Sequence, residues 1–171
     1  MADQLALDIG PHGMQRAAEI SECGRYRYLL GRRWGDESTV AFIMLNPSTA
    51  DAETDDPTIR RCIGFARSWG YGGLVVGNLY AWRCTQPADL WKAADPIGPA
   101  NDYNLMLVAA SCDQIVAAWG AHARPDRIAA VQALPGMGGL TALATTQAGQ
   151  PRHPLYLAGN LTPKPWEAPD A

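Results

Sequence analysis

The chain has 171 residues, of which 47% are hydrophobic, and a formal net charge of −3 from 14 Lys and Arg against 17 Asp and Glu. This length and composition predict a single domain with one substantial core. The acidic balance excludes a globally positive surface of the kind that attracts nucleic acid, although it leaves room for a local basic face. No apolar run is long enough for a transmembrane helix, and the opening "MADQ" lacks the positive charge of a signal peptide. We therefore expect a cytoplasmic protein without membrane contact.

The first half of the chain predicts two strands and a helix. Residues 1–20 are turn-rich and are expected to be a lead-in to the domain. Residues 25–33 begin by alternating polar and aromatic side chains, the pattern of an edge strand, and an apolar run over 38–45 predicts a buried strand. Asp56 and Pro57 are typical of a helix start, with apolar residues then following at helical spacing.

The second half alternates further apolar runs with helical segments. The expected strands cover residues 74–80, 114–119 and 139–144, and the expected helices cover 87–93, 101–110 and 125–134. The Pro-rich tail over 163–171 is expected to fray.

Apolar strands separated by helices describe a parallel sheet that is covered on both faces. We therefore predict an α/β fold: a three-layer α/β/α sandwich with a central, mainly parallel sheet of four strands and residues 25–33 added at its edge. All of it belongs to one domain, over residues 21–162. The strands ending at Asn46 and Asn78 are expected to pair in parallel.

Polar residues follow the predicted parallel strands at the points where the strands end. Asn46 follows the first strand, Asn78 ends the second, His122 follows the third and His153 comes after the fourth. Ligands bind beyond the carboxyl ends of such strands, because connecting loops and helix N-termini converge there. We therefore predict one concave pocket lined by Asn46, Asn78 and His153. Three further residues are expected close by: Thr49, Asp51 and Tyr80.

The order of these motifs resembles that of the uracil-DNA glycosylase superfamily. "LNPSTAD" is similar to the Asn-Pro first motif of the mismatch-specific branch, "VVGNLYAWRCTQP" to the second motif of the thermophilic-type branch, and "HPLYL" to the late His-Pro motif. A closer resemblance, over roughly residues 25–160, is to the domain of unknown function 1643. This family of short bacterial and phage proteins is marked by "MLNPSTAD…DDPTIRRC", and it has no activity that carries over to this chain.

The superfamily resemblance implies a uracil-DNA glycosylase-like fold and hydrolysis of the N-glycosidic bond of an unusual or modified nucleobase. Asn46 would then orient the attacking water, and Asp51 would stabilise the cationic sugar or act as the base. His153, when neutral, would donate a hydrogen bond to the departing base, whose edge Asn78 would recognise. Tyr80 or Trp82 would stack on the base. The remaining substrate-binding residues that the resemblance implies are Pro47, Ser48, Thr49 and Arg83.

The chain also departs from the superfamily pattern. Asp55 and Asp56 occupy the region after the first motif where these glycosylases usually place an aromatic residue that stacks on the base. These glycosylases also have a bulky wedge residue after the late His-Pro, and here only residues 155–157 could supply it. Of the four cysteines, Cys84 falls where a ligand of the iron–sulfur branch would lie, but the others do not. We therefore expect no metal and no cofactor.

Simpler structural explanations exist for each candidate. Asn46 suits an ordinary turn, Asn78 a loop anchor, His153 a surface turn, and Asp56 a helix N-terminus.

Two other function classes also remain open. One is a module that recognises a nucleobase or nucleic acid without cleaving it, and the other is an enzyme acting on free nucleosides or nucleotides. Salt dependence separates them, because binding to nucleic acid weakens steeply as salt rises. The oligomeric state is not predicted.

Overall fold

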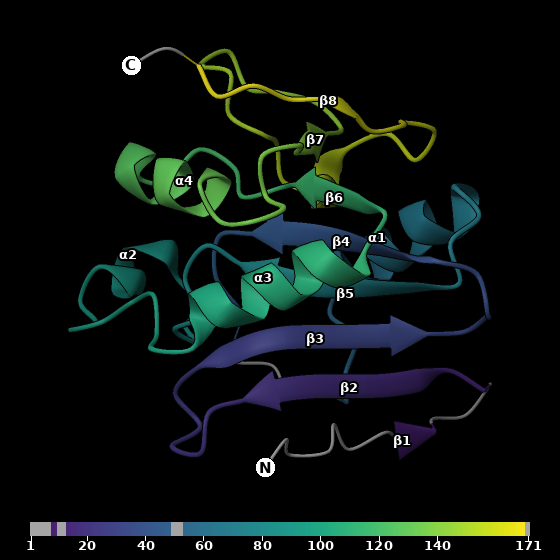
Figure 1. The fold of residues 1–171 in the computed structure, drawn as a ribbon, viewed down its shortest axis with the longest axis horizontal. Coiled ribbons are helices and arrows are strands. Elements are labelled where there is room, and N and C mark those ends of the chain that lie inside the picture. The colour runs from purple at the N-terminus through teal and green to yellow at the C-terminus, as the bar shows by residue number, and fades with distance from the viewer. Residues whose placement is uncertain (1–7, 10–12, 49–52, 170–171) are drawn as a thin grey trace.

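A computed structural model describes residues 8–9, 13–48 and 53–169, which form one mixed α/β domain around an eight-stranded sheet (Figure 1). The order of the strands across the sheet is β1-β2-β3-β5-β4-β6-β7-β8. The strands are β1 (Asp8–Ile9), β2 (Gln15–Ile20), β3 (Arg27–Arg33), β4 (Thr39–Met44), β5 (Gly73–Asn78), β6 (Gln114–Ala117), β7 (Thr141–Ala142) and β8 (Lys164–Pro165). The helices are α1 (Pro57–Ser68), α2 (Pro87–Leu90), α3 (Asn101–Ser111) and α4 (Pro125–Gln132), with a 3-10 turn η1 (Pro154–Tyr156).

The centre of the sheet is parallel. β4 pairs in parallel with β5 on one side and with β6 on the other, and β6 pairs in parallel with β7. The register sets Met44 beside Asn78 at the carboxyl ends of β4 and β5. The prediction that the strands ending at Asn46 and Asn78 pair in parallel is therefore confirmed.

Antiparallel strands extend this centre on both sides, so a four-stranded sheet was the wrong expectation. On one side β3 pairs antiparallel with β5, β2 with β3, and β1 with β2; on the other, β8 pairs antiparallel with β7. The predicted edge strand over 25–33 is therefore internal, because β2 covers it. Residues 15–20, expected in the lead-in, form this covering strand, and residues 164–165 of the tail expected to fray form β8.

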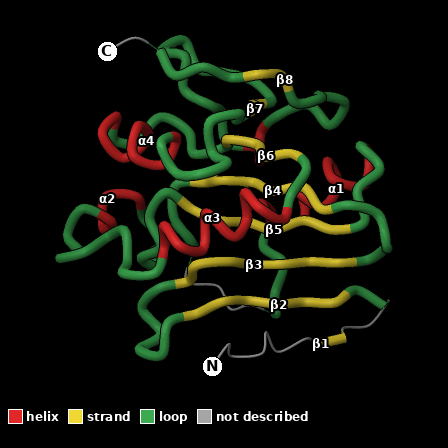
Figure 2. Tube along the Cα trace, viewed as in Figure 1, coloured by secondary structure: helices red, strands yellow, loops and turns green. Residues whose placement is uncertain are grey.

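Helices cover both faces of the sheet, as the alternation of side chains along β4 requires. Val40, Phe42 and Met44 belong to the apolar cluster that includes α1, whereas Ala41 and Ile43 belong to the cluster that includes α3 and α4. In the view of Figures 1 and 2, α3 and α4 lie in front of the sheet and α1 lies behind it. The sheet is therefore buried between two helical layers.

Local chemistry fixes where α1 begins. Asp56 is its N-cap, and its Oδ1 accepts a hydrogen bond from the Ile59 backbone amide at 2.8 Å. Pro57 occupies the first turn, where the missing amide hydrogen leaves no bond unmade. Such a cap stabilises a helix by about 1 kcal/mol. Gly70, with φ of +85°, follows the helix in the left-handed conformation that ends many helices.

The connections leave β4 and β6 in opposite directions. The chain runs from β4 through α1 on one face to β5, and from β6 through α4 on the other face to β7. A crevice forms beyond the carboxyl ends of two strands whose connections diverge in this way, and it is the usual ligand site of open α/β sheets. In the described part of the chain, no helix is long and apolar enough to cross a membrane.

Candidate functional site

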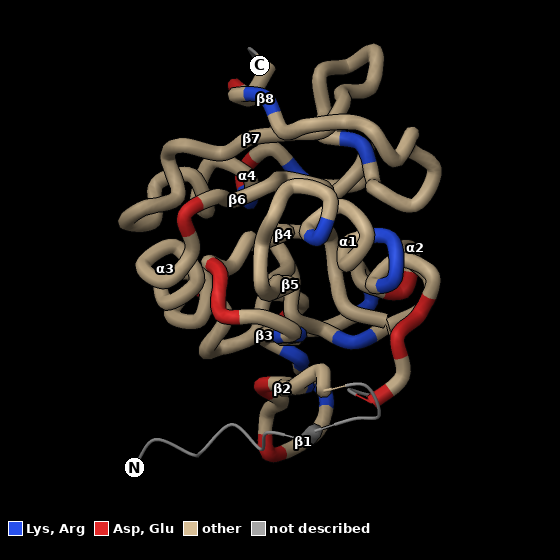
Figure 3. The backbone as a smooth tube through the Cα atoms, turned by 90° about the vertical axis from the view of Figure 1, so that its right-hand side faces the viewer, with Lys and Arg blue, Asp and Glu red and all other residues tan. Residues whose placement is uncertain are grey.

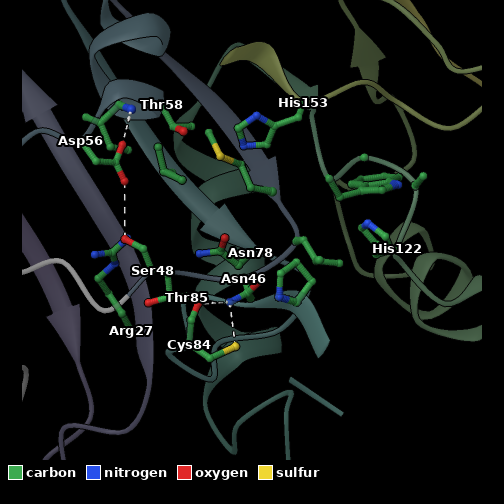
Figure 4. A pocket seen from close by; sticks show the side chains of 18 residues that line it. Arg27, Asn46, Ser48, Asp56, Thr58, Asn78, Cys84, Thr85, His122 and His153 are labelled. Carbon is green, nitrogen blue, oxygen red and sulfur yellow. Dashed lines mark hydrogen bonds between the residues drawn. The ribbon is translucent and has the colours of Figure 1, made fainter. Parts of the chain in front are cut away.

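A cavity of about 440 Å³ opens beyond the carboxyl ends of β4, β5 and β6 (Figure 4). Its walls come from the segments that follow these strands, from the start of α1, from β3 and from the turn before η1. Its volume lies within the range of small-molecule sites. Asn46, Asn78 and His153 all line it, although they lie far apart in the sequence.

Asn46 is held in place by the segment after β5. Its Nδ2 donates to the backbone oxygens of Cys84 at 2.9 Å and Pro47 at 3.0 Å, and it approaches the Cys84 Sγ at 3.3 Å. Two carbonyl groups can only accept hydrogen bonds, so they fix which end of the amide is the nitrogen. No hydrogen bond within the described residues uses Oδ1. Asn46 therefore offers an oriented acceptor.

Asn78 lies at the end of β5 and is only 2% exposed. Its backbone oxygen accepts a hydrogen bond from the Asn101 side chain at 3.0 Å, which fixes the main chain at this point. The carboxamide itself makes no hydrogen bond to any other described residue, and Figure 4 shows it among the residues that line the cavity. Its nitrogen and oxygen are not among the fully buried side-chain atoms that lack a partner, so the cavity leaves the amide accessible. A ligand with complementary donor and acceptor atoms would satisfy both ends of this amide.

His153 lines the cavity from the turn that begins η1. Its Nδ1 accepts a hydrogen bond from the Leu155 backbone amide at 3.3 Å, so the neutral ring carries its proton on Nε2. Burial lowers the pKa of His153, and the negative charge of Asp56 opposes this shift. The ring is therefore neutral at pH 7 and has one N–H group available as a donor.

Asp56 connects the helix cap to the cavity, because the carboxylate that caps α1 also lines the wall. Its Oδ2 accepts a weak hydrogen bond from the Ser48 hydroxyl at 3.5 Å. Both oxygens of the carboxylate are therefore engaged, one by the helix and one by the segment after β4. Thr58 lies beside it on the same wall.

Arg27 brings a positive charge to the cavity from β3. The side chain is 5% exposed. Burial lowers the pKa of Arg27 to about 10, with a further lowering by Arg83 and an opposing effect of Asp56. Arg27 therefore stays protonated at pH 7. Among the described residues, it is the one Lys or Arg that lines the cavity.

Aromatic surface comes from the segment after β6. Trp119 lines the cavity and is 2% exposed. Its Nε1 donates to Gln150 Oε1 at 3.1 Å, and its ring packs edge-on against Trp166 with 5.1 Å between the centroids. His122, three residues further on, lines the cavity as well. The sequence placed His122 at this edge of the sheet, but neither residue was assigned a role in the predicted pocket.

Several predicted substrate-binding residues lie elsewhere. Tyr80 is 3% exposed and packs edge-on against Trp91, because the chain after β5 turns it towards the core on the α3 and α4 face. Trp82 pairs with Tyr26, and Arg83 donates to the Gly24 oxygen, so both belong to the antiparallel side of the sheet.

Of the residues that follow β4, Ser48 lines the cavity, whereas Pro47 supports it through its carbonyl group. Thr49 and Asp51 lie outside the described residues. In the part of the chain that is described, no three His, Cys, Asp or Glu side chains cluster as a metal site would require.

Comparison with known proteins places this chain in a family. A family model described as "Protein of unknown function (DUF1643)" matches residues 27–155. The chain belongs to the DUF1643 family. No curated protein and no solved structure matches it. The matched segment begins at Arg27 and ends just beyond His153, so all the residues that line the cavity fall within the family's own region.

The residues missed in the DUF1643 segment share one property: their place in the cavity depends on tertiary structure. Arg27 was part of a predicted edge strand, and it is buried because β2 and the cavity wall surround this side of the sheet. Asp56 could have been predicted as a cavity residue, since a carboxylate at a helix start beyond a parallel strand lies at the ligand-binding edge of the sheet. Trp119 ends a predicted strand, and it both packs in the core and lines the cavity.

Proposed function

We propose that this protein binds a nucleobase in the cavity and hydrolyses its N-glycosidic bond, as a DNA glycosylase-like enzyme acting on an unusual or modified base. The observation that carries the proposal is the carboxamide of Asn78. The residue is 2% exposed, it lines the cavity, and its carboxamide makes no hydrogen bond to any other described residue. A carboxamide presents a donor beside an acceptor, and the edge of a nucleobase presents the complementary pair.

Two neighbours supply the polar groups that bond cleavage needs. As the glycosidic bond breaks, the sugar becomes positive and the base becomes negative; the oxygen of a water molecule then bonds to the sugar carbon, and its proton passes to the departing base. The Asn46 Oδ1 is an acceptor of fixed orientation, suited to holding that water. The Nε2–H of neutral His153 is a donor, suited to the oxygen on which the negative charge of the base grows. Donors that are fixed in advance favour the charged transition state over the neutral substrate.

Aromatic residues near the cavity suit a flat ligand. Trp119 takes the place that was assigned to Tyr80 or Trp82, since it is the tryptophan that lines the cavity. Tyr156, three residues after His153, is 83% exposed, whereas Leu157 is 5% exposed. Of the three wedge candidates after the late His-Pro, Tyr156 is therefore the one that can enter the gap left by a base removed from its stack.

One observation favours a second function, recognition of the base without cleavage. Asp56 is the one carboxylate among the described residues that line the cavity, and both of its oxygens are already hydrogen-bonded. A carboxylate engaged in this way is a poor general base. In the view of Figure 3, segments with Lys and Arg lie among segments with Asp and Glu. Cleavage of the glycosidic bond by the wild-type protein would distinguish hydrolysis from recognition alone.

The test is incubation with oligonucleotides that carry uracil, mismatched thymine or a hypermodified base, followed by alkaline strand scission. We expect Asn46→Ala and His153→Ala each to lower the single-turnover rate on the order of a hundred- to a thousandfold. Asn78→Asp is expected to change the preference between bases by roughly ten- to a hundredfold. Asn160→Ala, which alters an exposed amide outside the cavity, is the control and should leave rate and preference unchanged.

The rate should also depend on pH in a defined direction. Protonation of His153 places a hydrogen on Nδ1 and breaks its hydrogen bond with the Leu155 amide. Because the pKa of His153 is lowered, the neutral ring is retained down to pH values below its usual pKa of about 6.5. The rate is then expected to fall only as pH decreases through the lowered value. Tight, Asn78-dependent binding of a base with no strand scission would instead establish the recognition function.

A further inference from the structure

The polar groups of the cavity are divided between two sides. In Figure 4, Arg27, Ser48 and Thr85 lie on one side, His122 and His153 lie on the other, and the amides of Asn46 and Asn78 lie between them. One side therefore combines a cation with hydroxyl groups, and the other presents imidazole rings. A ligand that spans the cavity meets two different chemistries at its two ends.

The charged side is built around Arg27. Arg27 is only 5% exposed, and it lies on a strand rather than on a loop. A guanidinium presents a planar fork of N–H donors, which matches the oxygens of a phosphate or carboxylate group. A site on a regular strand also holds such a fork more rigidly than a loop would.

The carboxylate on the same wall has its own structural role. Asp56 caps α1 through the Ile59 amide and accepts from the Ser48 hydroxyl. A carboxylate at a helix N-terminus is stabilised by the orphan amides and by the helix dipole. Asp56 also acts on Arg27, because its negative charge opposes the lowering of the Arg27 pKa, so two opposite charges share this wall. Among the described residues, Arg27 is the cation on this wall that a ligand would meet.

The size of the cavity agrees with a ligand larger than a single ring. About 440 Å³ is within the range that holds drug-sized molecules. A base recognised by Asn78 leaves space on the Arg27 side for the sugar and one further group.

We infer that the ligand carries a phosphate group that binds Arg27, so that the protein selects a nucleotide over the corresponding nucleoside or free base. This inference rests on the proposed function, because it takes the base to be the group at Asn78. Two sources supply this chemistry: the 5′-phosphate of a free nucleotide and a phosphodiester in a nucleic-acid strand.

The experiment is a calorimetric titration of the full chain with the common deoxynucleosides, including deoxyuridine, with their 5′-monophosphates, and with inorganic phosphate. For the preferred base, the monophosphate is expected to bind roughly ten- to a hundredfold more tightly than the nucleoside, as for hydrogen bonds to a charged group. Arg27→Gln should reduce this ratio to about one, and Arg27→Lys should restore part of it. Arg67→Gln removes an exposed arginine outside the cavity and should leave the ratio unchanged.

Each outcome has a defined meaning. Equal affinities for nucleoside and monophosphate in the wild-type protein overturn the inference, even if an Arg27 variant does not fold, and they leave the proposed function standing. Phosphate binding that requires Arg27 but is the same for every base, and is unaffected by Asn78→Asp, supports the anion site and contradicts the proposed function. Absence of binding by every probe, phosphate included, overturns the inference, whereas the proposed function is overturned only by the strand-scission test.

A further titration identifies the source of the phosphate group. Where the monophosphate is preferred over the nucleoside, tighter binding of a short single-stranded oligonucleotide than of the monophosphate identifies the phosphodiester as the source.

Discussion

The parallel centre of the sheet and its antiparallel flank contribute differently to the cavity. The centre, made of β5, β4, β6 and β7, ends in the segments that carry Asn46, Asn78 and Trp119. Of the described residues of the flank, made of β1, β2 and β3, Arg27 is the one that lines the cavity. Amides and an indole therefore come from the centre, and the positive charge comes from the flank.

The two regions are joined by a buried ion pair. Asp55, just before α1, accepts from Arg32 Nε on β3 at 2.8 Å, and the Arg32 side chain is fully buried. Arg16 on β2 approaches the other oxygen of Asp55 at 3.4 Å and also donates to the Glu53 oxygen. The flank thus holds the segment that leads into the helix cap at Asp56. The comparison teaches that the flank positions a wall of the cavity as well as widening the sheet.

The strongest way to break this arrangement is Asp55→Ala. The change removes the carboxylate that faces the fully buried Arg32 and is expected to lower the free energy of unfolding by roughly 3–5 kcal/mol. Urea denaturation measures the loss. Asp36→Ala, at an exposed position, is the control and should change stability by less than about 0.5 kcal/mol. Equal stability of the two variants would mean that the ion pair does not join flank to centre.

Substitution of one glycine in each region by alanine tests how tightly the two regions are packed. A Cβ at Gly77 on β5 would lie 2.9 Å from Leu105 Cδ2 and 3.3 Å from Ile43 Cδ1, whereas one at Gly31 on β3 would lie 3.6 Å from Ala17 Cβ. Gly77→Ala is therefore expected to cost about 1–3 kcal/mol. Gly31→Ala should stabilise the protein by about 0.4–1 kcal/mol, because it restricts the unfolded chain. Thermal or urea unfolding of both variants gives the sign of each change.

Alkylation of two cysteines compares the flank with the cavity wall without any substitution in the protein. Cys23, in the turn between β2 and β3, is exposed, and hydrogen bonds from Arg25 and Ser21 lower its pKa to about 7. Burial raises the pKa of Cys84 in the cavity wall. Since the thiolate is the reactive form, iodoacetamide at pH 7.5 should alkylate Cys23 well before Cys84, as mass spectrometry of peptides would show. Labelling of Cys84 first would contradict these environments.

The parallel centre was largely predictable from the sequence. The apolar runs of β4 and β5 are long and uninterrupted, and the Asp56-Pro57 pair identified the start of α1. Asn46, Asn78 and His153 were brought together by the rule that parallel strands end at one edge. Such features depend on neighbours in the sequence or on a general property of the fold.

The flank and the cavity's charge were not predictable in the same way. The strand "QRAAEI" over 15–20 has intermediate exposure at five of its six positions, so it lacks the alternation that identifies a strand with one buried face. β8 is only two residues long. Whether Tyr80 or Trp119 lines the cavity depends on how the chain turns after β5 and β6, which the order of residues does not reveal.

The edge contact between Trp119 and Trp166 determines how far the chain can be shortened in experiments. Trp166 directly follows β8, and its Nε1 donates to the Gly149 oxygen next to Gln150, which accepts from Trp119. The family match ends at residue 155, so a protein trimmed to that match would lose the indole that supports the cavity wall. Experiments on the cavity therefore need a chain that is longer than the segment by which the family is recognised.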